Sequence, residues 1–173
     1  MPTVSHRGYR IAVEHPAVWV DRGERIIRDL VEVMMNRQIT DECLRHLIAS
    51  RERLVAGHYE LPDDGGCLMF VLTKPLGEAQ IRTKHDLIRF FGRPRGFPGW
   101  PGYVAAKDSP EYQPAKWLVR LIDGQFCEQV RSRYGRACEL FDYDLVIAAA
   151  RQILAQRCGA STPARGELQM AGS

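Results

Sequence analysis

Arginines alternate with aromatic rings between residues 89 and 107, a stretch without a carboxylate. Arginine and lysine neutralise phosphates, and aromatic rings stack on unpaired bases, so this mixture is typical of a single-stranded nucleic-acid site. The residues that we predict to bind nucleic acid or a partner are Arg89, Arg93, Arg95, Phe97, Trp100, Tyr103 and Lys107.

The same stretch contains four glycines and three prolines, which exclude a helix or a central strand. We therefore expect a loop whose aromatic rings either pack on the core or are exposed and bind a partner. For the loop taken by itself we favour packing, with Phe90, Phe91 and Trp100 in the core of an Ω-like loop. Its arginines would then be solvated or paired with the nearby carboxylates of Glu78, Asp108 and Glu111. A third interpretation is a docking surface for a protein, because Trp, Tyr and Arg commonly anchor interfaces.

Motifs of nucleophilic and phosphate-binding enzymes are missing from the sequence, which has no G-x-S-x-G, G-x-x-x-x-G-K-[ST] or G-x-G-x-x-G after a strand. The carboxylate pairs 63–64 and 142–144 lie at an expected turn and an expected helix start, where Asp is favoured structurally. We therefore expect a protein without a catalytic site or cofactor. An enzyme whose site is assembled from residues distant in sequence is the remaining alternative.

Cys43 and His46 are three residues apart on an expected helix, and His58 and Cys67 follow. Zinc accepts a Cys₂His₂ set, but these residues lack the short paired spacings of recognised zinc sites, and Cys67 belongs to an apolar run. We predict no metal site, while the sequence leaves open whether the four side chains converge.

The five cysteines are widely spaced and form no C-x-x-C, and no charged and apolar leader precedes them. The apolar runs are shorter than the roughly 20 residues of a membrane-spanning helix. We therefore expect a cytoplasmic protein with no membrane partner. The net charge of +3 is mild, so binding to nucleic acid must depend on local clusters of cations.

The first half of the chain predicts one short strand at residues 9–13 and two helices. A capping box at residues 21–24 starts a helix that reaches about Asn36, and Thr40 caps a second helix that ends at Gly57. The spacing of the apolar residues predicts one apolar stripe along each of the two helices. The linker of about four residues makes the pair an antiparallel hairpin or a helix-turn-helix corner. We favour a scaffold role for this pair over reading of DNA.

The middle of the chain predicts a small sheet and a short helix. Residues 67–72 form a continuous apolar run, which we interpret as a buried strand, with residues 79–82 as its possible neighbour. Thr83 then caps a helix at residues 84–91.

Ser109 starts the next helix, and residues 117–134 then allow either two helices or a hairpin turning at Asp123-Gly124. We favour helices, because Phe126, Val130 and Tyr134 keep a spacing of four. An Asp at 142 or 144 caps the last helix, which we expect to end at Gly159.

Together these patterns predict a mainly α-helical α+β protein, with a single compact domain at residues 1–158 and a flexible tail at 159–173. The domain would contain about five or six helices and a small sheet. The predicted function is non-enzymatic binding of nucleic acid or assembly with a nucleoprotein. The alternatives are a protein interaction or assembly module, and an enzyme with a dispersed site.

Overall fold

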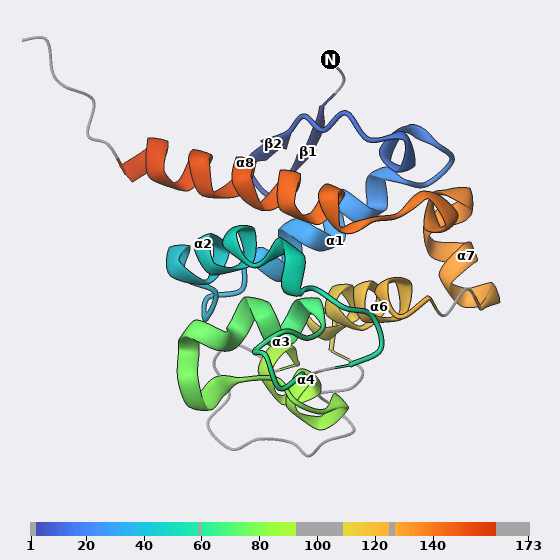
Figure 1. The fold of residues 1–173 in the computed structure, drawn as a ribbon. Coiled ribbons are helices and arrows are strands. Elements are labelled where there is room, and N and C mark those ends of the chain that lie inside the picture. Colours follow the sequence, from blue (N-terminus) through green and yellow to red (C-terminus); the bar gives the residue numbers. More distant parts are fainter. Residues whose placement is uncertain (1–2, 59, 93–108, 125–126, 162–173) are drawn as a thin grey trace, which may run out of the picture.

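The computed structural model describes residues 3–58, 60–92, 109–124 and 127–161 of the chain. Within these residues it forms seven α-helices, four short 3₁₀ helices and one two-stranded antiparallel sheet (Figure 1). This confirms the predicted mainly α-helical α+β class. None of the helices in the described ranges combines the length and the apolar composition that crossing a membrane requires.

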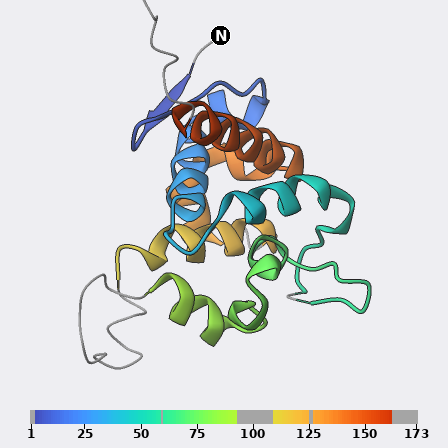
Figure 2. The ribbon, with the colours of Figure 1, turned by 90° about the vertical axis from the view of Figure 1, so that its left-hand side faces the viewer.

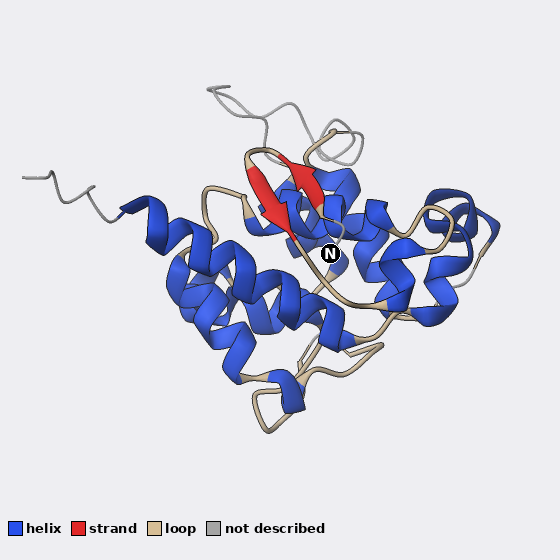
Figure 3. Cartoon of the chain, turned by 90° about the horizontal axis from the view of Figure 1, so that it is seen from above, coloured by secondary structure: helices blue, strands red, loops and turns tan. Residues whose placement is uncertain are grey.

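The sheet is an N-terminal hairpin of β1 (Val4–His6) and β2 (Tyr9–Ile11), which lies beside the last helix (Figure 3). Its two-residue turn, Arg7-Gly8, has φ values of 50° and 85°. Positive φ at both central residues suits the right-handed twist of a hairpin, and glycine adopts it without strain. The predicted strand at 9–13 is therefore confirmed in shorter form, with a partner strand that the sequence pattern did not reveal.

Two glutamines of α8 (Tyr143–Ser161) bind the backbone beside β2. Gln152 accepts from the Ala12 amide at 2.8 Å and donates to the Ala12 carbonyl at 2.5 Å. Gln156 repeats this arrangement with Arg10, at 3.0 and 2.9 Å. Each side-chain amide thus takes the place of a peptide group in a neighbouring strand. It pairs with backbone N–H and C=O groups at an edge of the hairpin that has no partner strand among the described residues.

Gln152→Glu is expected to lower the free energy of unfolding by about 1–3 kcal/mol, because a carboxylate cannot donate to the Ala12 carbonyl. Urea denaturation followed by circular dichroism measures the change. The matched control is Gln129→Glu, because Gln129 accepts a hydrogen bond from Arg120, which a carboxylate also does. Equal effects of the two substitutions would contradict the proposed role of the glutamine pairing.

The helices form successive layers beneath α8. The long α8 covers α1 and α2, and α3, α4 and α6 lie on the opposite side of these two helices (Figures 1 and 2). A further helix, α7, packs against α1 and α6. The bounds are α1 (Glu24–Met34), α2 (Asp41–Ala49), α3 (Leu68–Thr73), α4 (Lys84–Phe91), α6 (Tyr112–Ile122) and α7 (Glu128–Tyr134).

Four 3₁₀ helices connect these layers. The first and the last of them pack against each other beside the start of α1. Their bounds are η1 (Pro16–Trp19), η2 (Arg51–Arg53), η3 (Lys74–Ala79) and η4 (Gly135–Leu140).

The helix pair α1 and α2 has the predicted apolar stripe but a shorter second member. The stripe residues of α1 are all buried: Ile26, Ile27, Leu30, Val31 and Met34. Thr40 caps α2 as predicted, because its hydroxyl accepts from the Cys43 amide. The predicted end at Gly57 is wrong, since the chain leaves the helix after Ala49 and Leu54 forms a β-bridge with Gly66. Figure 2 shows that α1 and α2 meet at a corner.

The predicted strand at residues 67–72 is wrong, because this run forms α3. Every residue of α3 is buried, and a helix covered on all sides has the same uninterrupted apolar pattern as a strand covered on both faces. The second predicted strand, at 79–82, is also wrong. It spans the end of η3 and an extended segment in which Ile81 is fully buried.

The predicted helix starts are confirmed where a side chain caps the helix by binding a backbone amide two or three residues further along the chain. Thr83 and Asp86 form a capping box at α4, and Asp142 accepts from the Asp144 amide at the start of α8. The capping box predicted at 21–24 is wrong: Gly23 is the N-cap residue, without a side-chain cap. Asp21 has a φ of 50° and accepts instead from the Arg136 amide in η4.

Residues 117–124 and 127–134 contain the end of α6, a turn in which Gly124 has a φ of 70°, and α7. The helical alternative is therefore confirmed for the described residues. The last helix continues to Ser161, past the end predicted at Gly159. The domain boundary and the tail remain predictions, and residues 162–173 lie outside the described part of the chain.

Candidate nucleic-acid interface

The structure places one of the seven predicted binding residues. Arg89 is exposed in the last turn of α4. The other six lie outside the described residues, and they are Arg93, Arg95, Phe97, Trp100, Tyr103 and Lys107.

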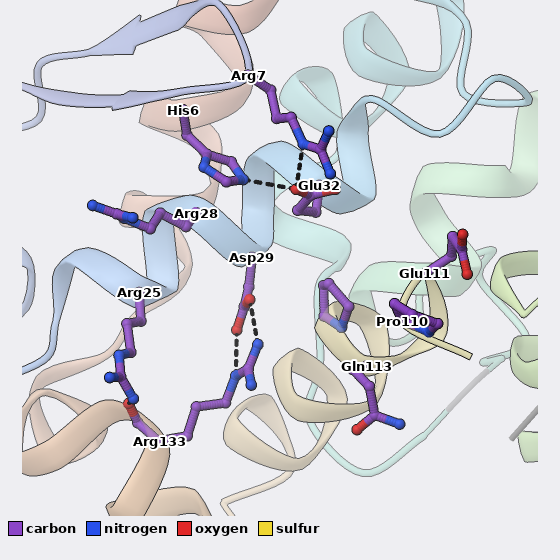
Figure 4. Close-up of a pocket in the computed structure, with 11 residues that line it drawn as sticks. His6, Arg7, Arg25, Arg28, Asp29, Glu32, Pro110, Glu111, Gln113 and Arg133 are labelled. Atoms are coloured by element: carbon purple, nitrogen blue, oxygen red, sulfur yellow. Dashed lines mark hydrogen bonds and ion pairs between the residues drawn. The ribbon is translucent and has the colours of Figure 1, made fainter. Parts of the chain in front are cut away.

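A groove lies where this predicted segment joins α6. Its volume is about 510 Å³, and its walls come from the hairpin turn, α1, the start of α6 and the end of α7 (Figure 4). Pro110 and Glu111, which lie three and four residues after the end of the predicted segment at Lys107, form one wall. Arg25 and Arg28 of α1 lie across the groove from them (Figure 4).

The floor of the groove is a buried ion pair between α1 and α7. The carboxylate of Asp29, which is 4% exposed, accepts two bonds from Arg133, at 2.7 and 2.6 Å. It also accepts from the hydroxyl of the fully buried Tyr134 at 2.5 Å. Burial and the adjacent carboxylate raise the pKa of Tyr134 well above its ordinary value, so the phenol remains a donor. Bidentate pairing of this kind fixes the orientation of the Arg133 guanidinium.

The rim of the groove is closed by a second ion pair. Glu32 of α1 binds His6 at 2.7 Å and Arg7 at 2.9 Å, so it ties the hairpin turn to α1 (Figure 4). Partial burial raises the pKa of Glu32, but its bonds to Arg7 and His6 outweigh this effect and lower the pKa below 4.5. The carboxylate is therefore charged at neutral pH. Its stabilising contribution is present above the unfolded value of 4.5 and is lost as the pH falls below it.

Two further arginines of the α1 region cap the end of α7. Arg22 donates to the carbonyl of Ser132, and Arg25 donates to the carbonyl of Arg133 at 3.3 Å. Cations are favoured there, because the last carbonyls of a helix are unpaired and carry partial negative charge. Arg28 lies 3.9 Å from Glu24, a long distance for an ion pair. Arg25 and Arg28 are both exposed, and their guanidinium groups have further N–H donors available for an anion.

A second hollow, of about 580 Å³, adjoins the groove and shares Arg25 and Arg133 with it. Trp117 of α6 forms part of its wall and is half-buried. Its ring centre lies 5.0 Å from Lys116 Nζ, 5.1 Å from Arg120 Cζ and 5.9 Å from Arg133 Cζ. The hollow therefore combines an aromatic surface with clustered cations.

Trp117 was not predicted as a site residue, and this hollow was not expected from the sequence. A local signal was present, because Lys116 and Arg120 are one and three positions away from Trp117 on α6. The contributions of Arg25 and Arg133 had no such signal, since only the fold brings α1 and α7 to α6.

The other candidate constellations have structural explanations. Asp64 pairs with Lys74 at 2.6 Å, and Asp63 accepts from the Gly65 amide within its turn. Cys43 is buried and accepts from the Thr40 hydroxyl at 3.3 Å. In the described part of the chain no group of three or more His, Cys, Asp or Glu side chains is placed to hold a metal ion.

Comparison with known proteins yields no family model, no curated protein and no solved structure that is similar to this chain. No residue role is therefore transferred from a relative. The functional conclusion rests on the chemistry of the groove, the hollow and the segment that leads to them.

Proposed function

We propose that this protein binds nucleic acid, or assembles with a nucleoprotein, without a catalytic site of its own. The observation that supports this function is the position of the segment 89–107 in the chain: it leads into Pro110 and Glu111 at the wall of a groove that carries Arg25 and Arg28. Cations in the segment and in the groove would neutralise consecutive phosphates, and the rings of the segment would stack on bases.

The charge pattern suits a local site. A net charge of +3 provides little attraction over the whole molecule, whereas residues 89–107 contain cations and no carboxylate. Binding through a few phosphates releases counterions, so the affinity must fall as the salt concentration rises. This salt dependence distinguishes the proposed function from a protein docking surface.

The test is fluorescence anisotropy of labelled single-stranded and duplex oligonucleotides with the full chain. We expect the affinity for the single strand to fall at least about tenfold between about 50 mM and about 200 mM salt. A variant carrying Arg93→Ala, Arg95→Ala and Trp100→Ala should lose this binding. Its matched control carries Arg82→Ala, Arg151→Ala and Trp19→Ala, which remove the same residue types at exposed positions elsewhere. Absence of wild-type binding at low salt would overturn the proposal.

A cytoplasmic location belongs to the same proposal. All five cysteines are free thiols, and three of them are buried. Free thiols persist in reducing compartments, which supports this location. Burial raises the pKa of Cys67 to about 11, so its thiol stays neutral and unreactive at physiological pH.

Two thiols per chain are expected to react quickly with a chromogenic disulfide reagent in the folded protein, those of Cys127 and Cys158. The thiols of Cys43, Cys67 and Cys138 should react only after unfolding, because they are buried. Counting the released chromophore with and without denaturant measures both groups. The double variant Cys127→Ser, Cys158→Ser is the control, and it should lack the fast phase.

A second candidate function is a protein assembly module, and one observation favours it. Trp19 is 42% exposed and Leu140 is 43% exposed, and the elements that carry them, η1 and η4, pack against each other. Exposed Trp side chains are common anchors of protein interfaces, and exposed apolar residues that lie together can mark an interaction site. Light scattering after size exclusion tests this function, since a stable oligomer that Trp19→Ser converts to monomer would support it.

A further inference from the structure

We infer that the hollow around Trp117 is a stacking site for one unpaired base of a nucleic-acid strand, with the flanking phosphates held by the arginines and the lysine beside it. This inference rests on the proposed function and adds a binding site that lies outside the segment 89–107. Its residues come from three helices, of which α1 is distant in sequence from the other two: Arg25 from α1, Lys116 and Trp117 from α6, and Gln129, Ser132 and Arg133 from α7.

The size and shape of the hollow suit a single nucleotide. Small-molecule sites commonly have volumes of about 300–1,000 Å³, and the hollow has about 580 Å³. Because the ring of Trp117 is half-buried in the wall of a hollow, a base must leave its stack to reach it. Bases of a duplex remain stacked inside the helix, so the geometry favours a single strand.

The cations around the Trp117 ring can bind the phosphates of a strand whose base stacks on the ring. Lys116 and Arg120 have long, flexible side chains whose cationic groups lie 5.0 and 5.1 Å from the ring centre. A base that enters can replace such a cation on the ring while the cation moves to a phosphate. Arg133 remains in place, because Asp29 holds its guanidinium by two hydrogen bonds.

Polar groups on α7 can bind the edge of the base. Gln129 and Ser132 line the hollow and are exposed, and the Gln129 side-chain oxygen accepts from Arg120 at 3.0 Å, which leaves its amide N–H groups to face a base. Glu128 also lines it, and a carboxylate there accepts from an exocyclic amino group but repels a phosphate. The phosphates are therefore expected on the side of Arg25, where the hollow continues into the groove.

The continuity of the two cavities supports a path for a strand rather than an isolated pocket. Arg25 and Arg133 line both cavities, and the groove extends to Pro110, three residues after Lys107 in sequence. A strand bound by the segment 89–107 would thus have a path from Pro110 to Trp117, with Glu111 on one wall and Arg25 and Arg28 on the other.

The experiment uses intrinsic fluorescence of the full chain, which contains three tryptophans. The variant Trp19→Phe, Trp100→Phe leaves Trp117 as the only tryptophan and keeps a ring at each changed position. A 15-nucleotide oligo-dT is expected to quench this emission in a salt-sensitive manner, while a duplex of equal length does so only at concentrations at least about tenfold higher.

Affinity measurements by anisotropy provide the second readout. Trp117→Leu is expected to weaken binding of oligo-dT by about 5- to 150-fold, the range of one lost stacking contact. Trp19→Leu is the matched control, because it makes the same change at an exposed ring outside the hollow, and it should leave the affinity unchanged. Arg25→Gln should reduce the slope of log affinity against log salt by about one.

The outcomes separate this inference from the proposed function. If the wild type binds the strand but neither the emission nor the affinity depends on Trp117, the stacking site is wrong and the proposed function stands. If no strand binds at low salt, both are wrong. If free dTMP quenches Trp117 as strongly as the strand does, the hollow is a mononucleotide site, which overturns its assignment to a strand. The fluorescence arm keeps the wild-type ring at 117, so it remains decisive even if Trp117→Leu fails to fold.

Discussion

Asp29→Ala is expected to destabilise the protein by about 3–5 kcal/mol, the usual cost of removing one member of a buried ion pair. The carboxylate is 4% exposed and joins α1 to α7 through Arg133 and Tyr134. Without it, the fully buried Tyr134 hydroxyl loses its acceptor, and the Arg133 guanidinium loses the partner that offset its desolvation.

Urea unfolding of the wild type and the variant measures this change. The control is Glu24→Ala on the same helix, whose exposed carboxylate lies 3.9 Å from Arg28 and should contribute less than about 1 kcal/mol. A double-mutant cycle with Tyr134→Phe tests the network directly. Asp29→Ala should cost less in the Tyr134→Phe background, because no buried hydroxyl is then left without an acceptor. An effect of Asp29→Ala as small as that of Glu24→Ala would contradict the network.

The same network shows why part of the candidate site could not be predicted from the sequence. The periodicity of α1 identified its apolar stripe correctly, but a carboxylate within a helix is ordinarily assigned to the solvent face. Asp29 is buried because Arg133, 104 positions away, pairs with it. Such a partner lies outside any local window, so neither the groove floor nor the fixed orientation of Arg133 had a sequence signal.

Structural features that depend on local contacts were predicted from the sequence more accurately than features that depend on tertiary packing. Thr40, Thr83 and Asp142 cap their helices with bonds that span only two or three residues, and their sequences predicted them. The apolar run at 67–72 did not distinguish a helix from a strand, because the packing of neighbouring elements decides which of them buries it. Of the candidate binding site, the sequence identified the segment 89–107 but not the hollow of Trp117, which requires α1 and α7.

The second large effect on stability is expected from substitution of Gly23, where the start of α1 closely approaches η1. A Cβ at this position would lie 1.6 Å from the Ala17 carbonyl oxygen and 3.0 Å from the Ala137 Cβ. The first of these atoms belongs to the backbone of η1 and cannot swing aside as a side chain does. The start of α1 packs against η1 there, so the two elements must separate to admit a methyl group.

Gly23→Ala is therefore expected to destabilise the fold by at least about 3 kcal/mol, at the upper end of the range for overpacked sites. Its matched control is Gly159→Ala, the same change within α8, where a Cβ meets no atom within 4 Å. Since alanine is the better helix former, this control should stabilise the protein by about 0.5–1 kcal/mol. Urea unfolding of both variants gives the two values, and a destabilised Gly159→Ala or a neutral Gly23→Ala would contradict the packing described here. Opposite signs for one chemical change would show that the contact with η1, rather than helix propensity, requires glycine at the start of α1.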